Sequence, residues 1–90
     1  MTESDTKSLL TFPCDFTIKV FGEATDEFEA SVLRIMHHYV PDLSDRAISS
    51  RKSGNGKYCA LSITLRVSSK KELDDIYREL TSSPQVLMAL

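Results

Sequence analysis

Residues 58–67, YCALSITLRV, decide the fold, because apolar and polar side chains alternate along the whole stretch. A period of two predicts a β-strand with one buried face and one face of different character. The apolar side holds Cys59, Leu61, Ile63, Leu65 and Val67, and the other side holds Tyr58, Ala60, Ser62, Thr64 and Arg66. A sheet built around this strand is therefore expected to be covered on one side only.

The preceding stretch, KSGNGKY at residues 52–58, raises the question of a phosphate-binding loop. A Walker-type loop needs GxxxxGK[ST] leading from a strand into a helix. Here the glycines have a different spacing, Lys57 is followed by Tyr58, and the loop lies between two expected strands. We interpret it as an Asn-Gly hairpin turn that follows an edge strand at residues 43–53; any further role would be to present Arg51, Lys52 and Lys57 beside Tyr58.

Two strand-to-helix units complete the pattern. Residues 15–21 alternate as a strand that Gly22 closes, and Asp26 with Glu29 predicts the N-cap of a helix that ends before Pro41. After the long strand, the capping box Ser69-Lys70-Lys71-Glu72 opens a second helix, which Ser82-Ser83-Pro84 stops. Residues 86–90 alternate again as a last strand.

The order β-α-β-β-α-β predicts an α+β fold, the ferredoxin-like βαββαβ sandwich, with an antiparallel four-stranded sheet and two helices on one face. Right-handed crossovers place the strands at 15–21 and 58–67 in the centre. Residues 1–14 are predicted to be an N-terminal arm and residues 15–90 a single domain.

Composition and charge restrict the function. The 90-residue chain has a formal net charge of −2, so it is a weak candidate for general nucleic-acid binding. It has neither a long apolar run nor a signal-peptide pattern at its start, which predicts a cytoplasmic protein without a membrane role. Cys14 and Cys59 form no CxxC pair and are expected to be buried or half-buried thiols.

No catalytic constellation stands out. His37 and His38 are neighbours in the last turn of the first helix, where they suit the helix dipole better than a metal site. The loop after the first strand lacks the arginine of an acylphosphatase-like site and the CxxC of a copper chaperone; its acids, Glu23, Asp26 and Glu27, suit the helix N-terminus. We predict no enzyme, no metal and no cofactor, and keep a hydrolase as a third alternative.

The uncovered side of the sheet is the candidate interaction surface. It is expected to show Thr17, Lys19, Phe21, Tyr58, Ala60, Ser62, Thr64, Arg66, Leu87 and Ala89. RNA-recognition modules of this topology stack bases on aromatic residues of the two central strands. Here Lys19, Phe21, Tyr58 and Arg66 are the candidates, with one aromatic expected at each end of the sheet, which is not a stacking platform. The sequence thus favours a protein partner or a second copy, and keeps single-stranded nucleic-acid binding as the alternative.

LLTFPCDFTIKVFGEA at residues 9–24 resembles the opening of the bacterial YbeD family, a group of small uncharacterised proteins. The matching residues are Leu9, Leu10, Phe12, Pro13, Phe16, Lys19, Val20 and Gly22. SSRKSGNGKYCALSITL at 49–65 is similar to a second family segment, through Ser53, Gly56, Tyr58, Ser62, Ile63 and Thr64, and LTSSPQVLMAL at 80–90 resembles the family ending. The turn before Gly56 is longer here than in the family pattern.

The resemblance implies a ferredoxin-like domain of the ACT type and brings no catalytic residues. It implies a non-enzymatic regulatory or binding domain whose ligand and partner are unknown. By analogy with ACT domains, a small molecule would bind at the loop after the first strand, at Gly22 and Glu23. A homodimer or a protein partner would use a sheet edge or the open face.

Overall fold

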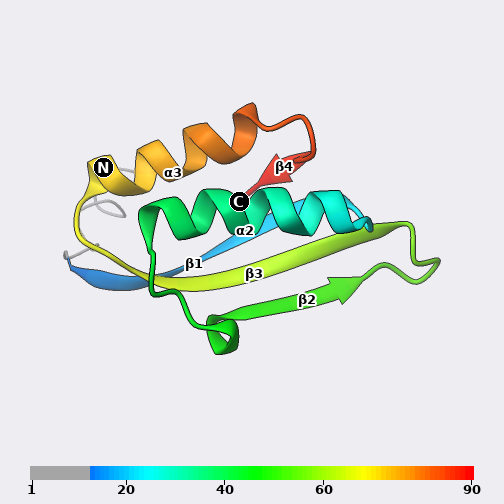
Figure 1. The fold of residues 1–90 in the computed structure, drawn as a ribbon, viewed down its shortest axis with the longest axis horizontal. Helices are drawn as coiled ribbons and strands as arrows, with labels where there is room; N and C mark the ends of the chain where they lie inside the picture. Colours follow the sequence, from blue (N-terminus) through cyan, green and yellow to red (C-terminus); the bar gives the residue numbers. More distant parts are fainter. Residues whose placement is uncertain (1–12) are drawn as a thin grey trace, which may run out of the picture.

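The structure is a computed structural model that describes residues 13–90, and its elements follow the expected order (Figure 1). They are β1 (Cys14–Glu23), α2 (Asp26–Tyr39), β2 (Ile48–Lys52), β3 (Tyr58–Val67), α3 (Lys70–Ser82) and β4 (Met88–Ala89). The strands form one antiparallel sheet in the order β2-β3-β1-β4, and both helices lie on the same face of it. The predicted fold class and the predicted central strands are confirmed.

The two central strands form a ribbon in which all ten residues of each are paired, from Cys14 opposite Val67 to Glu23 opposite Tyr58. β1 thus begins one residue before the expected domain start; residues 1–12 of the predicted arm lie outside the described part of the chain. No helix among residues 13–90 is long and apolar enough to cross a membrane.

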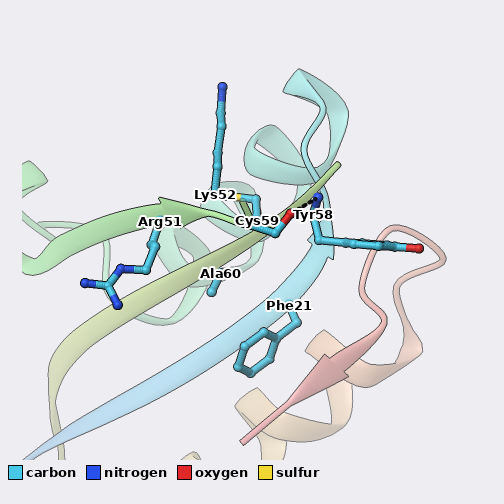
Figure 2. Close-up of a pocket in the computed structure, with 7 residues that line it drawn as sticks. Phe21, Arg51, Lys52, Tyr58, Cys59 and Ala60 are labelled. Carbon is cyan, nitrogen blue, oxygen red and sulfur yellow. Dashed lines mark hydrogen bonds between the residues drawn. The ribbon is translucent and has the colours of Figure 1, made fainter. Parts of the chain in front are cut away.

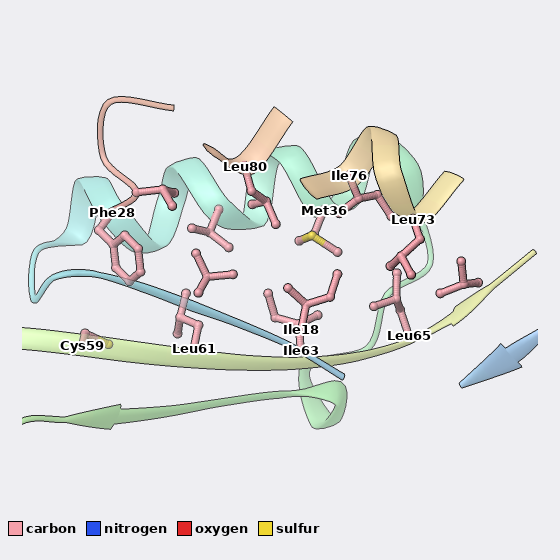
Figure 3. Packing of buried hydrophobic residues seen from close by; sticks show 14 residues of the cluster. Ile18, Phe28, Met36, Cys59, Leu61, Ile63, Leu65, Leu73, Ile76 and Leu80 are labelled. Atoms are coloured by element: carbon pink, nitrogen blue, oxygen red, sulfur yellow. The ribbon is translucent and has the colours of Figure 1, made fainter. Parts of the chain in front are cut away.

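The hydrophobic core fills the space between the sheet and the two helices (Figure 3). Phe28 and Met36 of α2 and Ile76 of α3 are at most 1% exposed, as are Ile18 and Leu61 of the central strands. The apolar stripe of each helix recurs at a spacing near 3.6 residues, so it faces the sheet along the whole helix. This packing leaves the opposite face of the sheet uncovered.

Hydroxyl side chains cap both helices. The predicted cap at Asp26 is wrong by one residue: Thr25 has extended backbone angles, and its Oγ1 accepts a hydrogen bond from the Phe28 N–H at 3.1 Å. Asp26 already belongs to the first turn, where its charge suits the helix dipole. The cap at Ser69 is confirmed, with its Oγ accepting from the Glu72 N–H at 3.2 Å.

The edge strand β2 is shorter than expected, because residues 45–47 form a turn of 3₁₀ helix before it. Ser44 Oγ caps this turn by accepting from the Arg46 N–H at 3.0 Å. The hairpin turn after β2 is confirmed: Gly56 has a φ of +73°, and the Ser53 N–H donates to the Tyr58 carbonyl at 2.8 Å. A left-handed residue in a hairpin turn favours glycine.

The last strand presents different residues to the open face from those expected. Ala89 pairs with the buried Val20 and packs against the core, whereas Met88 pairs with Phe21 on the open face. The prediction that Ala89 lies on the open face is therefore wrong, and Met88, which was not predicted there, lies on that face. The Leu87 N–H also donates to the Phe21 carbonyl, at 2.8 Å, so two residues oppose one, as in a β-bulge, and the alternation shifts.

Candidate functional site

The register of the sheet places side chains of three strands in rows across the open face. Arg51 of β2 lies opposite Ala60 of β3, which lies opposite Phe21 of β1. Two residues further along, the next row consists of Ser49, Ser62 and Lys19. Directly opposed residues point to the same face, so each row is a strip of neighbouring side chains. The middle of both rows is small, with an alanine in one and a serine in the other.

The two aromatic residues of this face lie at the same end of the sheet. Phe21 is near the end of β1 and Tyr58 begins β3, and antiparallel pairing brings these positions together. The expectation of one aromatic at each end of the sheet is therefore wrong. Tyr58 is 42% exposed, and Phe21 is half-buried. The sequence contained the information needed, because the antiparallel order of the two strands fixes which positions meet.

A hollow of about 220 Å³ opens between these residues and the end of β2 (Figure 2). It is lined by Phe21, Arg51, Lys52, Ser53, Tyr58, Cys59 and Ala60. Figure 2 shows Arg51, Ala60 and Phe21 on one side of the strands, whereas Lys52 extends from the other side. A second hollow, of about 410 Å³, continues along the sheet to Lys19 and Ser49, sharing Phe21, Arg51 and Ala60 with the first. Together they form the open-face hollow.

Positive charge borders the open-face hollow. Within residues 13–90, neither Lys19 nor Arg51 forms a salt bridge, and the lining of both hollows includes no Asp or Glu. Lys57 lies beside this end, with its Nζ 5.5 Å from the centre of the Tyr58 ring, within the range of a cation–π contact. The nearest acid by register is Glu23, opposite Tyr58.

Arg66, the fourth residue predicted for this surface, lies apart from the other three. It is eight residues from Tyr58 along β3, which corresponds to roughly 27 Å of extended strand. Its guanidinium Nη1 is 3.4 Å from Oδ1 of Asp15, the residue opposite it. Lys19, Phe21 and Tyr58 thus gather around the hollow, while Arg66 forms an exposed ion pair at the other end. Arg51 lies at the hollow instead, and the set of residues predicted for the open face did not include it.

Gly22 has a structural reason to be glycine. A Cβ built on it would lie within 2.4 Å of two carbons of the Phe28 ring and 2.7 Å from the Gln85 carbonyl oxygen. The ring therefore occupies the space above this buried residue. Glu23 is exposed at the end of β1. A ligand role for Gly22 and Glu23 stays a prediction.

Two tyrosines on the helices, Tyr39 of α2 and Tyr77 of α3, have raised pKa values. Tyr39 donates a hydrogen bond from its hydroxyl to Glu79 Oε1 at 2.9 Å, and this bond raises the pKa of the phenol. Burial raises the pKa of Tyr77. Cys14 is half-buried and Cys59 buried, both as free thiols, as expected. Among residues 13–90, no three His, Cys, Asp or Glu side chains are grouped to hold a metal ion.

Comparisons with known proteins agree with the resemblance noted in the sequence. A UPF0250 protein from Nitrosomonas europaea is 41% identical over 90 residues, covering 100% of both chains, and one from Chromobacterium violaceum is 39% identical over 88 residues, covering 97% of this chain and 99% of the other. The solution structure of HP0495 from H. pylori superposes with a TM-score of 0.70 at 17% identity, covering 90% of this chain and 85% of that one, and supports the fold. Residues 7–90 match the family described as protein of unknown function DUF493, so the chain belongs to the DUF493 or UPF0250 (YbeD) family of small bacterial proteins.

Proposed function

We propose that this protein is a non-enzymatic binding domain of the cytoplasm that contacts a partner through the open-face hollow. The observation that supports this is the contrast between the hollow and its surroundings. Two aromatic side chains and three cations, Arg51, Lys52 and Lys19, border a depression whose floor is the small residue Ala60. Concave sites with apolar walls and a few charged groups are typical of binding surfaces.

A binding role fits these residues better than catalysis. The described lining of the hollow holds no histidine and no carboxylate that could act as a general base beside Ser49, Ser53 or Ser62. The thiol of Cys59 belongs to the buried face of β3. A regulatory role of the ACT type is the form of this proposal that the family resemblance favours.

Paired co-purification tests the proposal. Wild type, the double variant Arg51→Glu/Tyr58→Ala and the helix-face variant Lys71→Glu are expressed at equal levels as tagged baits, and bound proteins and small molecules are identified by mass spectrometry. We expect partners that Lys71→Glu retains and the double variant loses. An identical set of partners for all three baits would contradict the proposal.

A second copy of the chain is one partner that this surface or the edge of β4 could bind. Leu87, Met88 and Leu90 are 48–63% exposed at that edge. Sedimentation at several protein concentrations measures such self-association. A strict monomer up to high micromolar concentration would leave a different molecule as the partner.

Single-stranded nucleic acid is the second candidate function. It is favoured by the position of Phe21 beside Tyr58, because neighbouring aromatics next to cations can stack successive bases. Fluorescence anisotropy with a labelled oligothymidine tests it. We expect affinity that falls as salt rises and that Tyr58→Ala weakens. Absence of salt-sensitive binding would eliminate this candidate.

A further inference from the structure

The small residues in the middle of the open face create a site for one particular chemistry. Ala60 is the floor of the first hollow, flanked by Arg51 on one strand and Phe21 on the other. We propose that this site binds an amphipathic organic anion. The flat apolar part of the ligand rests on Ala60 between Phe21 and Tyr58, and its carboxylate, sulfate or phosphate group is bound by Arg51 and Lys19. This inference rests on the proposed function and names the ligand class of the same site.

The apolar part follows from size and lining. At about 220 Å³, the first hollow is smaller than the pockets of 300 Å³ or more that hold drug-sized ligands, and it suits a ring system. Phe21 is half-buried and Tyr58 is 42% exposed, so a ring placed between them removes further apolar surface from water. Aromatic walls also favour stacked or edge-on contacts with such a ring.

The anionic part follows from two cations that form no salt bridge within residues 13–90. Arg51 and Lys19 lie on the two strands that flank β3, in adjacent rows, so their Cα atoms are roughly 12 Å apart by sheet geometry. Both side chains are long enough to converge on one group between them. A guanidinium binds a carboxylate or phosphate with two parallel hydrogen bonds. Along β1, Lys19 lies two residues before Phe21 and Glu23 lies two residues after it. The Glu23 carboxylate therefore repels an anion least where Arg51 and Lys19 bind it.

The number of cations favours one anionic group over a long phosphate chain. Among residues 13–90, three cations line the hollow, Arg51 and Lys19 on the open face and Lys52 from the other side of the strands, and the whole chain has a formal net charge of −2. A polyanion gains affinity from many phosphate contacts, which this face does not supply. A nucleotide has the same chemistry as a small aromatic anion, so competition titrations are needed to distinguish the two ligands.

Anilinonaphthalene sulfonate, an aromatic anion whose fluorescence rises in apolar surroundings, is the first probe. Its uncharged counterpart, N-phenylnaphthylamine, and inorganic sulfate test the two halves of the ligand separately. Adenosine monophosphate and a short oligothymidine enter as competitors, to distinguish a free anion, a mononucleotide and a nucleic-acid strand. Amide shifts in nuclear magnetic resonance spectra of the wild type locate the bound probe.

Three variants test the assignment. Ala60→Leu fills the floor of the hollow, Arg51→Gln removes the first cation, and Arg78→Gln, an exposed position on α3, is the matched control. We expect saturable binding of the sulfonate, its loss in Ala60→Leu, a weakening of about fivefold in Arg51→Gln, and no change in Arg78→Gln. Thermal unfolding confirms that each variant is folded; Ser62→Leu, in the second hollow, replaces Ala60→Leu if the latter does not fold.

The results separate this inference from the proposed function. Sulfonate binding that survives Ala60→Leu, or that the uncharged probe matches in affinity, overturns the inference. If the sulfonate does not bind but the open-face double variant loses its cellular partners, the inference fails and the proposed function stands. If the sulfonate binds in the hollow and the partners are unchanged, the site is confirmed and the protein-binding role fails.

Discussion

The two faces of β3 differ in what restricts their residues. On the helix side Leu61, Ile63 and Val67 are fully buried under α2 and α3. On the open side Ala60 and Ser62 are half-buried, and Thr64 is exposed. Volume and shape restrict which residues fit on the helix side, because an interior position tolerates little change in size. The open side is free of that requirement. Small, aromatic and cationic residues can therefore be combined there to bind a partner.

The largest expected effect tests this contrast within one strand. Ile63→Ala removes a fully buried side chain and should lower the free energy of unfolding by about 2–5 kcal/mol. Thr64→Ala loses one exposed hydrogen bond, 3.0 Å between its Oγ1 and that of Thr17, and should cost about 1 kcal/mol or less. Urea unfolding measures both. Equal losses would mean that the two faces contribute alike to stability.

A smaller effect is expected where the covered face leaves no room for a side chain. Gly22→Ala places a methyl group against the Phe28 ring and should cost about 1–3 kcal/mol. The control is Gly54→Ala, which meets no atom within 4 Å and should be neutral or slightly stabilising.

A second substitution tests whether overlap with the Phe28 ring causes the Gly22 effect. Phe28→Leu in combination with Gly22→Ala should destabilise by less than the sum of the two single changes, because the smaller side chain relieves the overlap. Additive losses in urea unfolding would show that the methyl group and the ring do not interact.

Sequence alone could predict the fold because its periods are clear. Alternation over 58–67 predicts a strand, and the helical stripe after Asp26 predicts a helix. Short connections leave few ways to join the elements into one fold. The ACT-like resemblance agreed with that order. The same reasoning named Lys19, Phe21 and Tyr58, which the structure brings to one end of the open face.

The predictions that were wrong concern positions shifted by a single residue. Leu87 and Met88 both lie opposite Phe21, and no sequence pattern marks that extra residue, so Ala89 was assigned to the wrong face. Thr25 and Asp26 are both good cap residues, and only the backbone angles distinguish them. Arg51 was expected beside Tyr58 but was left out of the open-face set, because the weak pattern of residues 43–53 did not fix its register with β3.

Effects near 1 kcal/mol are expected at the start of the helix that covers the sheet. Thr25→Ala removes the hydroxyl that accepts from the Phe28 N–H and should lower the free energy of unfolding by about 1 kcal/mol. Asp26→Asn keeps the shape and removes a charge near the helix N-terminus, so it should cost about half as much or less. A larger loss for Asp26→Asn in urea unfolding would show that the Asp26 charge stabilises the start of the helix more than the Thr25 hydroxyl does.

The smallest effect concerns the tyrosines at the rim of the covered face. Tyr39 and Tyr77 pack against the core, and the folded state raises the pKa of both above 10.0, through the Glu79 hydrogen bond for Tyr39 and through burial for Tyr77. The folded protein therefore holds these phenol protons more tightly than the unfolded chain. Their contribution to stability is complete below the unfolded pKa and is lost as the pH rises through the folded pKa.

The urea midpoint should thus fall above pH 10, the value from which both tyrosine pKa values are raised. Tyr77→Phe and Tyr39→Phe should each reduce that fall, measured from about pH 8 to 11. Lysine deprotonation affects wild type and variants alike, so the difference between their curves isolates the tyrosines. An unchanged fall in the Tyr39→Phe/Tyr77→Phe double variant would show that neither phenol is linked to the packing of the helices on the sheet.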